Sequence, residues 1–185
     1  MTTRVRARLR DLTSTDTDRI LALTRATGVF RGEELEIAAE VFRDCVAAPG
    51  PSGGGGAGVV GAELSSAPTT PRAYYALGGE LEGELVGWIC WGQTPCTDGT
   101  WDLYWLAVDP AAHGMGVGTA LVEEMERRLT GTARLISVDT SGRTDYEPTR
   151  AFYAARGYHA VARVPDFYAP GDDQVIFTKA ISAQP

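Results

Sequence analysis

Residues 106–121 have the sequence Leu-Ala-Val-Asp-Pro-Ala-Ala-His-Gly-Met-Gly-Val-Gly-Thr-Ala-Leu, and this stretch decides which folds the chain can adopt. A strand pattern leads into a short turn, alternating glycines follow, and a helix begins at about Val117. Backbone N–H groups and the positive end of the dipole at a helix N-terminus favour an anion. Glycines at 114, 116 and 118 lack the Cβ atoms that would keep a phosphate from the backbone. The stretch therefore predicts a diphosphate-binding site, and a glycine-rich helix start without a ligand is the alternative.

Hydrophobic periodicity predicts the elements on either side of this stretch. Strands are predicted over residues 4–10, 73–77, 84–92, 100–108, 135–138, 159–164 and 174–180. Helices are predicted from the capping stretch 12–16 to about residue 28, over 33–46, over 117–129 and from 148 to 157. The glycine-rich residues 78–83 are predicted to form a hairpin connection between two of the strands. This order indicates an α/β protein with a mixed sheet and helices on both faces.

The length of 185 residues fits one domain, which we expect to span residues 1–185. Pro49-Gly50-Pro51-Ser52 and the four glycines after it begin a biased segment that continues to about residue 71. Such a composition buries too little apolar surface to offset the entropy of ordering. We therefore predict a flexible insertion at about 48–71, inside a single domain.

Composition and charge exclude several classes of function. A net charge of −7, with no basic patch beyond the arginines of residues 4–10, argues against a nucleic-acid partner, because binding the phosphates of a nucleic acid needs clustered Lys and Arg. No apolar run is long enough for a membrane helix, and residues 1–10 lack the apolar core of a secretion signal, so a cytoplasmic protein is expected. Three cysteines without CxxC spacing and two histidines make no credible metal set, and Cys90 is expected to be a small buried hydrophobe.

The loop resembles the coenzyme-A loop of the GNAT superfamily of N-acetyltransferases, in which Arg or Gln is followed by two residues, Gly, one residue, and Gly or Ala. Gly116 and Gly118 match this pattern, while His113 and Met115 stand where the family often has Gln or basic residues. The resemblance implies the GNAT fold, a mixed central sheet of about seven strands flanked by four helices. It also implies an enzyme that moves an acetyl group from acetyl-CoA directly to a primary amine, without a metal.

The same resemblance implies which residues bind the cofactor. In the family, the strand before the loop splays from its neighbour and its free backbone groups pair with the pantetheine arm. The implied cofactor residues are Leu106, Ala107, Val108, His113, Gly114, Met115, Gly116, Val117, Gly118 and Thr119. His113 and Met115 remove side-chain contacts to phosphate and leave the backbone ones, so weaker cofactor binding is an expectation.

Residues 150–158 resemble the Phe-Tyr-x-x-x-Gly-Phe helix of the family, which implies that Tyr153 protonates the departing thiolate. Packing under the cofactor is its alternative role. Asp102 stands where some GNAT enzymes place a catalytic glutamate, and strand alternation predicts that it shares a face with Tyr104, Leu106 and Val108. A hydrogen bond to a loop is the other reading of Asp102. Asp139 is the second candidate for the base.

The acceptor amine stays open, since a small molecule and a peptide or protein both fit. Residues 166–173 resemble the acceptor-side loop of GNAT enzymes that modify peptide N-termini, which makes Tyr168 a substrate-contact candidate. Tyr104 and Phe30 are further acceptor-site candidates, with core packing as the alternative for Phe30. A homodimer is one option for the assembly.

Two other classes of function remain as alternatives. Gly114 and Gly116 after a strand, with Asp139 ending the next strand, partly fit a dinucleotide-binding oxidoreductase, but Thr119 occupies the third glycine position. A non-catalytic acyl-CoA-binding module on the same fold is the other alternative. The altered loop favours it, and the presence of Tyr153 and Asp102 argues against it.

Overall fold

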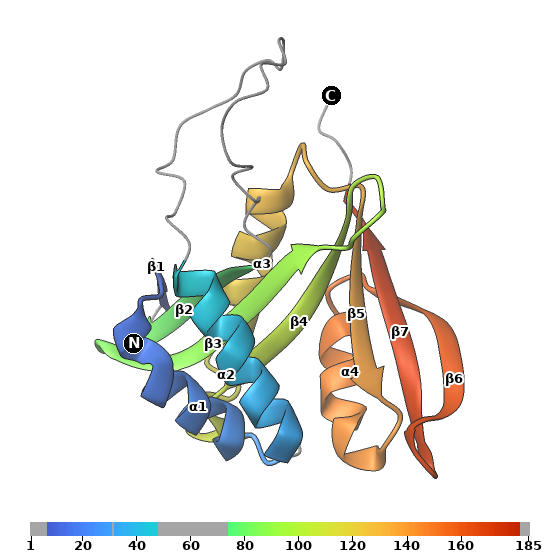
Figure 1. Ribbon diagram of the computed structural model, residues 1–185, viewed down its shortest axis with the longest axis horizontal. Helices are drawn as coiled ribbons and strands as arrows, with labels where there is room; N and C mark the ends of the chain where they lie inside the picture. Colours follow the sequence, from blue (N-terminus) through green and yellow to red (C-terminus); the bar gives the residue numbers. More distant parts are fainter. Residues whose placement is uncertain (1–6, 31, 48–73, 182–185) are drawn as a thin grey trace, which may run out of the picture.

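A computed structural model of the chain describes residues 7–30, 32–47 and 74–181 (Figure 1). One sheet has the strand order β1-β2-β3-β4-β5-β7-β6. Its strands are β1 Arg8–Asp11, β2 Tyr75–Leu81, β3 Glu84–Gln93, β4 Thr100–Val108, β5 Leu135–Ser141, β6 His159–Ala169 and β7 Asp172–Ala180. Only β4 and β5 are parallel neighbours among these strands. The predicted mixed sheet of about seven strands is confirmed, whereas a dinucleotide-binding domain would need several parallel βαβ units.

Four α-helices flank the sheet, as predicted: α1 Thr17–Ala26, α2 Gly32–Ala47, α3 Val117–Leu129 and α4 Glu147–Ala154. Helices α1 and α2 cover one face of the sheet, and α3 and α4 cover the other (Figure 1). None of the helices in the described part of the chain has the length and apolar character needed to cross a bilayer. The predicted insertion at 48–71 and the start of the predicted strand at 4–10 lie outside the described residues.

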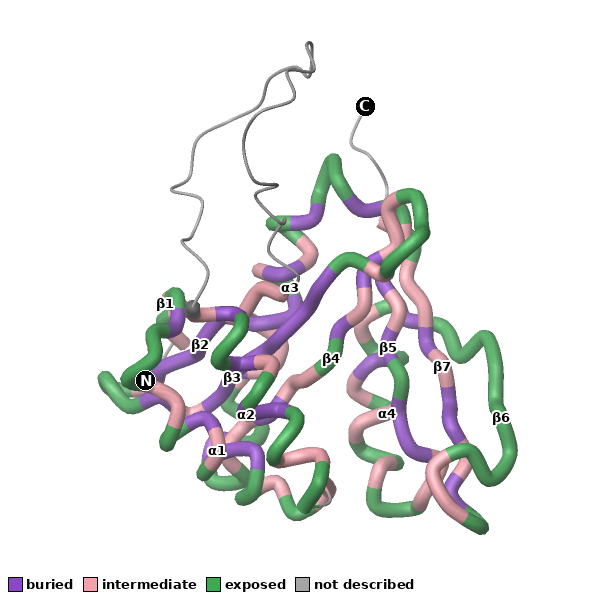
Figure 2. Tube along the Cα trace, in the orientation of Figure 1, coloured by how far each residue is buried: buried purple, intermediate pink, exposed green. Residues whose placement is uncertain are grey.

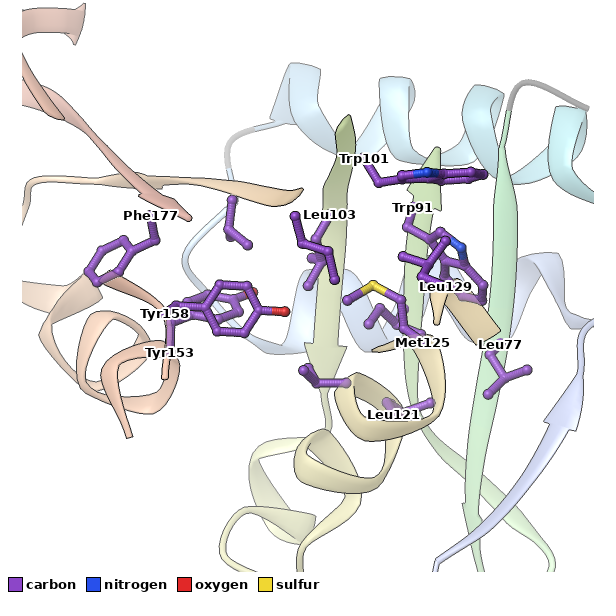
Figure 3. Packing of buried hydrophobic residues seen from close by; sticks show 14 of the residues in the cluster. Leu77, Trp91, Trp101, Leu103, Leu121, Met125, Leu129, Tyr153, Tyr158 and Phe177 are labelled. Atoms are coloured by element: carbon purple, nitrogen blue, oxygen red, sulfur yellow. The ribbon is translucent and has the colours of Figure 1, made fainter. Parts of the chain in front are cut away.

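The larger core lies between α3, α4 and the sheet (Figure 3). Leu121, Met125 and Leu129 follow one another at four-residue spacing, so one face of α3 packs onto the sheet. On the α4 side, Tyr153 and Phe177 extend this core across β7. Figure 2 shows burial concentrated in the central strands, whereas the edge strand β6 is exposed along most of its length. The core therefore holds the central strands and the α3 side as one unit.

The second core lies beneath α1 and α2, around the fully buried Trp88. The indole Nε1 of Trp88 donates a 3.0 Å hydrogen bond to Thr24 Oγ1, which in turn donates to the Ile20 carbonyl. This chain satisfies a polar atom that would otherwise be costly to bury. Cys90 is buried here with its Sγ 3.8 Å from Cys45 Sγ, as expected for a small hydrophobe.

The glycines at 78 and 79 lie inside β2, so the predicted hairpin connection over 78–83 is wrong in extent. Leu81 pairs with Glu84, which leaves only a two-residue turn between β2 and β3. The reason is the close approach of α3, because a Cβ on Gly79 would lie 2.9 Å from Val117 Cγ1. The small residues are therefore required by packing, and they bring the first turn of α3 down onto the sheet.

Strand β6 also runs further than predicted, to Ala169, and residues 165–168 form a bulge between Val164 and Ala169. The Asp173 carboxylate accepts a 2.9 Å hydrogen bond from the Asp166 N–H, and the Asp166 carboxylate accepts one from Gly171 N–H at 2.6 Å. These bonds hold the bulge against β7. Residues 166–169, which were predicted to lie in the loop between the last two strands, are therefore part of the sheet edge.

We expect Gly79→Ala to lower the free energy of unfolding by about 1–3 kcal/mol, because the added methyl group overpacks the contact with the β-branched Val117. Gly32→Ala is the control, since no atom lies within 4 Å of its added Cβ and its φ is not positive. That variant should leave stability within about 1 kcal/mol of the wild type or raise it. Urea unfolding of both variants measures the difference, and equal stabilities would contradict the packing role of Gly79.

Candidate active site

The parallel strands β4 and β5 diverge halfway along their length. They pair from Thr100 with Leu135 to Leu103 with Val138, and no pair is recorded beyond Leu103 although both described strands continue (Figure 1). The second half of β4 therefore has backbone N–H and C=O groups without a strand partner on the β5 side. Such groups need hydrogen-bond partners, and an extended ligand can supply them.

Strand β4 carries a β-bulge at Tyr104, just where the divergence begins. Trp105 pairs with Cys90 and Leu103 pairs with Trp91, so Tyr104 is an extra residue opposite β3. An inserted residue reverses the alternation of side chains along the strand. An even-numbered residue before the bulge and an even-numbered residue after it therefore face opposite sides of the sheet, and the same holds for odd-numbered residues.

The bulge corrects the predicted surroundings of Asp102. Leu106 and Val108 pack against the α3 core, as Leu103 does before the bulge, so they do not share the face of Asp102. The prediction from strand alternation was wrong because it assumes that the pairing of β4 with β3 has no bulge. The prediction holds for Tyr104, whose hydroxyl lies 3.4 Å from Asp102 Oδ2.

Two cavities open along the divergence and meet at its centre. One, of about 410 Å³, lies over residues 102–106 of β4 and 137–141 of β5. The other, of about 480 Å³, lies between the glycine loop and α4. Both are lined by the same group of residues where they join, namely Phe30, Leu106, Tyr146, Thr149 and Tyr153. Two ligands that enter from opposite sides would therefore touch beside these residues.

The glycine loop forms one end of the larger cavity. Gly114 and Gly116 have φ values of +77° and +86°, which favour glycine, and no atom lies near either position. The first helical hydrogen bond runs from Ala120 N–H to the Gly116 carbonyl at 2.9 Å, so the N–H groups of residues 117–119 precede it. This geometry suits an anion at the start of α3.

Most residues predicted to bind the cofactor line this cavity: Leu106, Val108, His113, Gly114, Gly116, Val117 and Gly118. The side chain of Ala107 is instead buried beneath α1 and α2, and Met115 is 53% exposed. Thr119 accepts a hydrogen bond from Arg156. His113 Nε2 donates to the Val108 carbonyl at 3.1 Å, so its ring completes the end of β4.

The smaller cavity is acidic. Arg143 is the one cation among its described lining residues, and its guanidinium is paired with Asp145 at 3.1 Å and Asp172 at 3.2 Å. The carboxylates that line it are Glu33, Glu34, Asp102, Asp139 and Asp172. Excess negative charge in a recess attracts cations. The cavity is therefore suited to a positively charged ligand rather than an anion.

Asp102 and Asp139 lie on neighbouring strands and line this cavity together. Asp102 Oδ2 accepts a 2.7 Å hydrogen bond from Thr94 Oγ1, so the predicted alternative of a bond to the preceding connection is present as well. Burial raises the pKa of Asp139, the nearby charge of Asp102 raises it further, and a 2.8 Å hydrogen bond from Gln174 opposes both. A carboxylate with a raised pKa is a stronger base than an ordinary carboxylate, so Asp139 is suited to accept a proton.

Tyr153 lies at the junction of the two cavities with its ring buried. The ring packs edge-on against Tyr158, with centroids 5.5 Å apart, and against Phe177 (Figure 3). Among the described residues no hydrogen bond engages its hydroxyl. Burial raises the pKa of Tyr153, so the phenol stays protonated at neutral pH and can donate a proton.

The three predicted acceptor residues, Phe30, Tyr104 and Tyr168, all line the acidic cavity. Burial raises the pKa of Tyr104 to about 12, and the negative charge of Asp102 adds to this effect. Burial likewise raises the pKa of Tyr168 to about 12, together with the charge of Asp139. Both phenols are therefore neutral hydrogen-bonding groups in the cavity.

Sequence reasoning missed several lining residues on or beside α4, namely Tyr146, Thr149 and Arg156. With the predicted Tyr153 they follow one another at spacings of three, four and three, as residues on one helical face do. That spacing was the sequence signal by which these lining residues could have been found. Glu34 and Arg143 were also missed, because nothing in their local sequence distinguishes them from solvated charges.

Comparison with known proteins agrees with this geometry. The model of the acetyltransferase (GNAT) family matches residues 61–158. An uncharacterized N-acetyltransferase of Methanocaldococcus jannaschii is 27% identical over 113 residues, which cover 59% of this chain and 67% of that protein.

Solved structures share the fold. A protein from Desulfovibrio desulfuricans assigned to the GNAT family of acetyltransferases is 28% identical, with a TM-score of 0.77 over 96% of this chain and 100% of that one. An aminoglycoside 6'-N-acetyltransferase in complex with coenzyme A is 18% identical, with a TM-score of 0.66 over 96% and 99% of the two chains. The second likeness concerns the fold alone.

Proposed function

This chain belongs to the acetyltransferase (GNAT) family, and we propose that it transfers the acetyl group of acetyl-CoA directly to a primary amine of a positively charged acceptor. The observation that carries the proposal is the junction of two cavities of opposite character at Tyr153. One cavity offers backbone N–H groups to an anion, and the other offers carboxylates to a cation.

The larger cavity fits acetyl-CoA. The loop from Gly114 to Gly118 supplies a backbone cradle for the diphosphate, since no side chain fills the space at Gly114 or Gly116. The free edge of β4 supplies N–H and C=O groups to the amide-containing pantetheine arm. Bound there, acetyl-CoA supplies an activated thioester carbonyl beside Tyr153.

The smaller cavity fits the amine. Its carboxylates exceed its cations, and the charge of Arg143 is paired with Asp145 and Asp172, which favours an acceptor with positive charge beyond the reacting amine. Tyr104, Tyr168 and Phe30 supply aromatic surface and hydroxyl groups that can orient it. A polyamine-like small molecule and the N-terminus of a basic peptide both have this chemistry.

The proposed reaction needs one base and one acid. An ammonium group has no lone pair, so its proton must leave first, and Asp139 takes it. The neutral amine then attacks the thioester carbonyl, a C–N bond forms, and the C–S bond breaks. Tyr153 donates its proton to the departing thiolate, and the acylated nitrogen loses its second proton to solvent as the amide forms. Tyr153 regains a proton from solvent, which its raised pKa permits, and Asp139 releases the proton it took.

Calorimetry with acetyl-CoA, followed by thiol release with a matched pair of amines, tests the proposal. We expect 1,5-diaminopentane to have a kcat/KM at least about tenfold above that of 5-aminopentan-1-ol, because its second ammonium group meets the carboxylates of the acidic cavity. Salt should reduce this difference. Equal rates for the two amines, or a preference for 5-aminopentanoate, would overturn the acceptor class.

We expect Tyr153→Phe to lower kcat about 10²-fold, because the proton donor for the thiolate is lost. The free energy of unfolding should change by less than about 1 kcal/mol, since the ring contacts remain. Steady-state kinetics and urea unfolding measure the two effects. An unchanged kcat would leave Tyr153 with a packing role only.

The pH dependence of kcat/KM distinguishes the two aspartates. Because the raised pKa of Asp139 delays its ionisation, the acidic limb of the wild-type profile should lie above the ordinary carboxyl range, with activity lost as pH falls. Asp139→Asn should abolish this limb. Asp102→Asn should move it to lower pH, because one charge that raises the pKa of Asp139 is removed. The reverse pattern would assign Asp102 as the base.

A further inference from the structure

The larger cavity contains an arginine that the proposed reaction does not use. Arg156 is the one Lys or Arg among its described lining residues, and its other charged lining residue, Asp145, is paired with Arg143. The loop itself carries no cation at Met115, and the His113 ring is engaged by the Val108 carbonyl. Among the described lining residues, Arg156 is therefore the one that offers side-chain positive charge to an anionic ligand.

Arg156 is held in place by its neighbours on two helices. Its Nη1 donates to the Phe152 carbonyl at 2.7 Å, and its Nη2 donates to Thr119 Oγ1. The guanidinium carbon lies 3.4 Å from the centre of the Phe152 ring, within the range of a cation–π contact. These contacts fix the planar group without neutralising its charge.

This position adjoins the anion-binding end of α3. Thr119 lies in the first turn of α3, and the Phe152 ring lies 3.4 Å from the position of a Cβ on Gly118. The guanidinium is thereby brought beside the helix N-terminus whose N–H groups precede the first helical bond. Side chain and backbone would act on the same anion.

Arg156 also has unsatisfied hydrogen-bonding capacity. Its Nε is buried without a partner, and none of the described carboxylates lies within ion-pair distance of its guanidinium. Burial lowers the pKa of Arg156, and the charges of Glu123 and Glu126 only partly oppose this shift. A phosphate group would supply the counter-charge that the guanidinium lacks.

We propose that Arg156 binds the diphosphate of coenzyme A, and thereby supplies from the turn after α4 the cationic contact that positions 113 and 115 of the loop do not provide. The inference rests on the proposed cofactor but concerns one residue of its site. Arginine suits this task because its planar fork can donate two parallel hydrogen bonds to a phosphate.

Calorimetric titration of the full chain with coenzyme A and with 3'-dephospho-CoA, which differ only in the 3'-phosphate, tests the assignment. Arg156→Gln should weaken both ligands by the same factor, about tenfold or more, because the diphosphate is common to them. The affinity of the Arg156→Gln variant for these ligands should also depend less on salt than the affinity of the wild type. Arg134→Gln is the matched control, because this substitution removes the same charge at an exposed position beside Asp98.

The two ligands distinguish the diphosphate from the 3'-phosphate as the group that Arg156 binds. Unchanged affinity in Arg156→Gln would overturn the inference while leaving the proposed function intact, and a loss confined to coenzyme A would assign Arg156 to the 3'-phosphate instead. A wild type that binds neither ligand would overturn the proposed function as well. If Arg156→Gln does not fold, Arg156→Lys replaces it, with at least about threefold weaker binding expected and wild-type affinity as the contradicting result.

Discussion

The parallel pairing of β4 with β5 ends after Leu103 and Val138, and the candidate site depends on that interruption. With continuous pairing, the second half of β4 would have no free backbone groups and the two cavities could not meet. The bulge at Tyr104 lies at the same place and turns Leu106 and Val108 toward the α3 core. The close packing of Val117 over Gly79 then sets the glycine loop at the end of this strand. One break in a ladder thus creates the space, and the packing around it supplies the walls.

Opposite chemical demands are met on the two sides of that break. Backbone N–H groups of a helix start face the larger cavity, where the anionic cofactor of an acetyltransferase would lie. Carboxylates face the smaller cavity, where an amine would lie, and the charge of Asp102 helps to raise the pKa of Asp139. Buried phenols separate the two, and Tyr153 belongs to both cavities. Charge separation of this kind brings a polyanionic donor and a cationic acceptor together at one point.

Several features of the site could be predicted because they depend on local sequence. The strand, glycine loop and helix over 100–129 follow from periodicity and from the conformational needs of glycine, and the structure has them at the expected residues. The extent of β2 could not be predicted in this way. Glycines at 78 and 79 resemble a turn locally, and only the approach of Val117 makes them buried strand residues. The prediction that Asp102 shares a face with Leu106 and Val108 was wrong for a similar reason, because the bulge at Tyr104 depends on pairing with the partner strand.

The sequence by itself determined the α/β class, the position of the anion-binding loop and the candidates Tyr153, Asp102 and Asp139, because these follow from local patterns and from a family motif. The tertiary structure alone decided that α2 brings Glu34 to the same cavity as Asp139, and that the turn after α4 brings Arg156 beside Thr119. Such groupings join segments far apart in the chain. Their distances depend on how helices and strands pack together, and no local pattern contains that information.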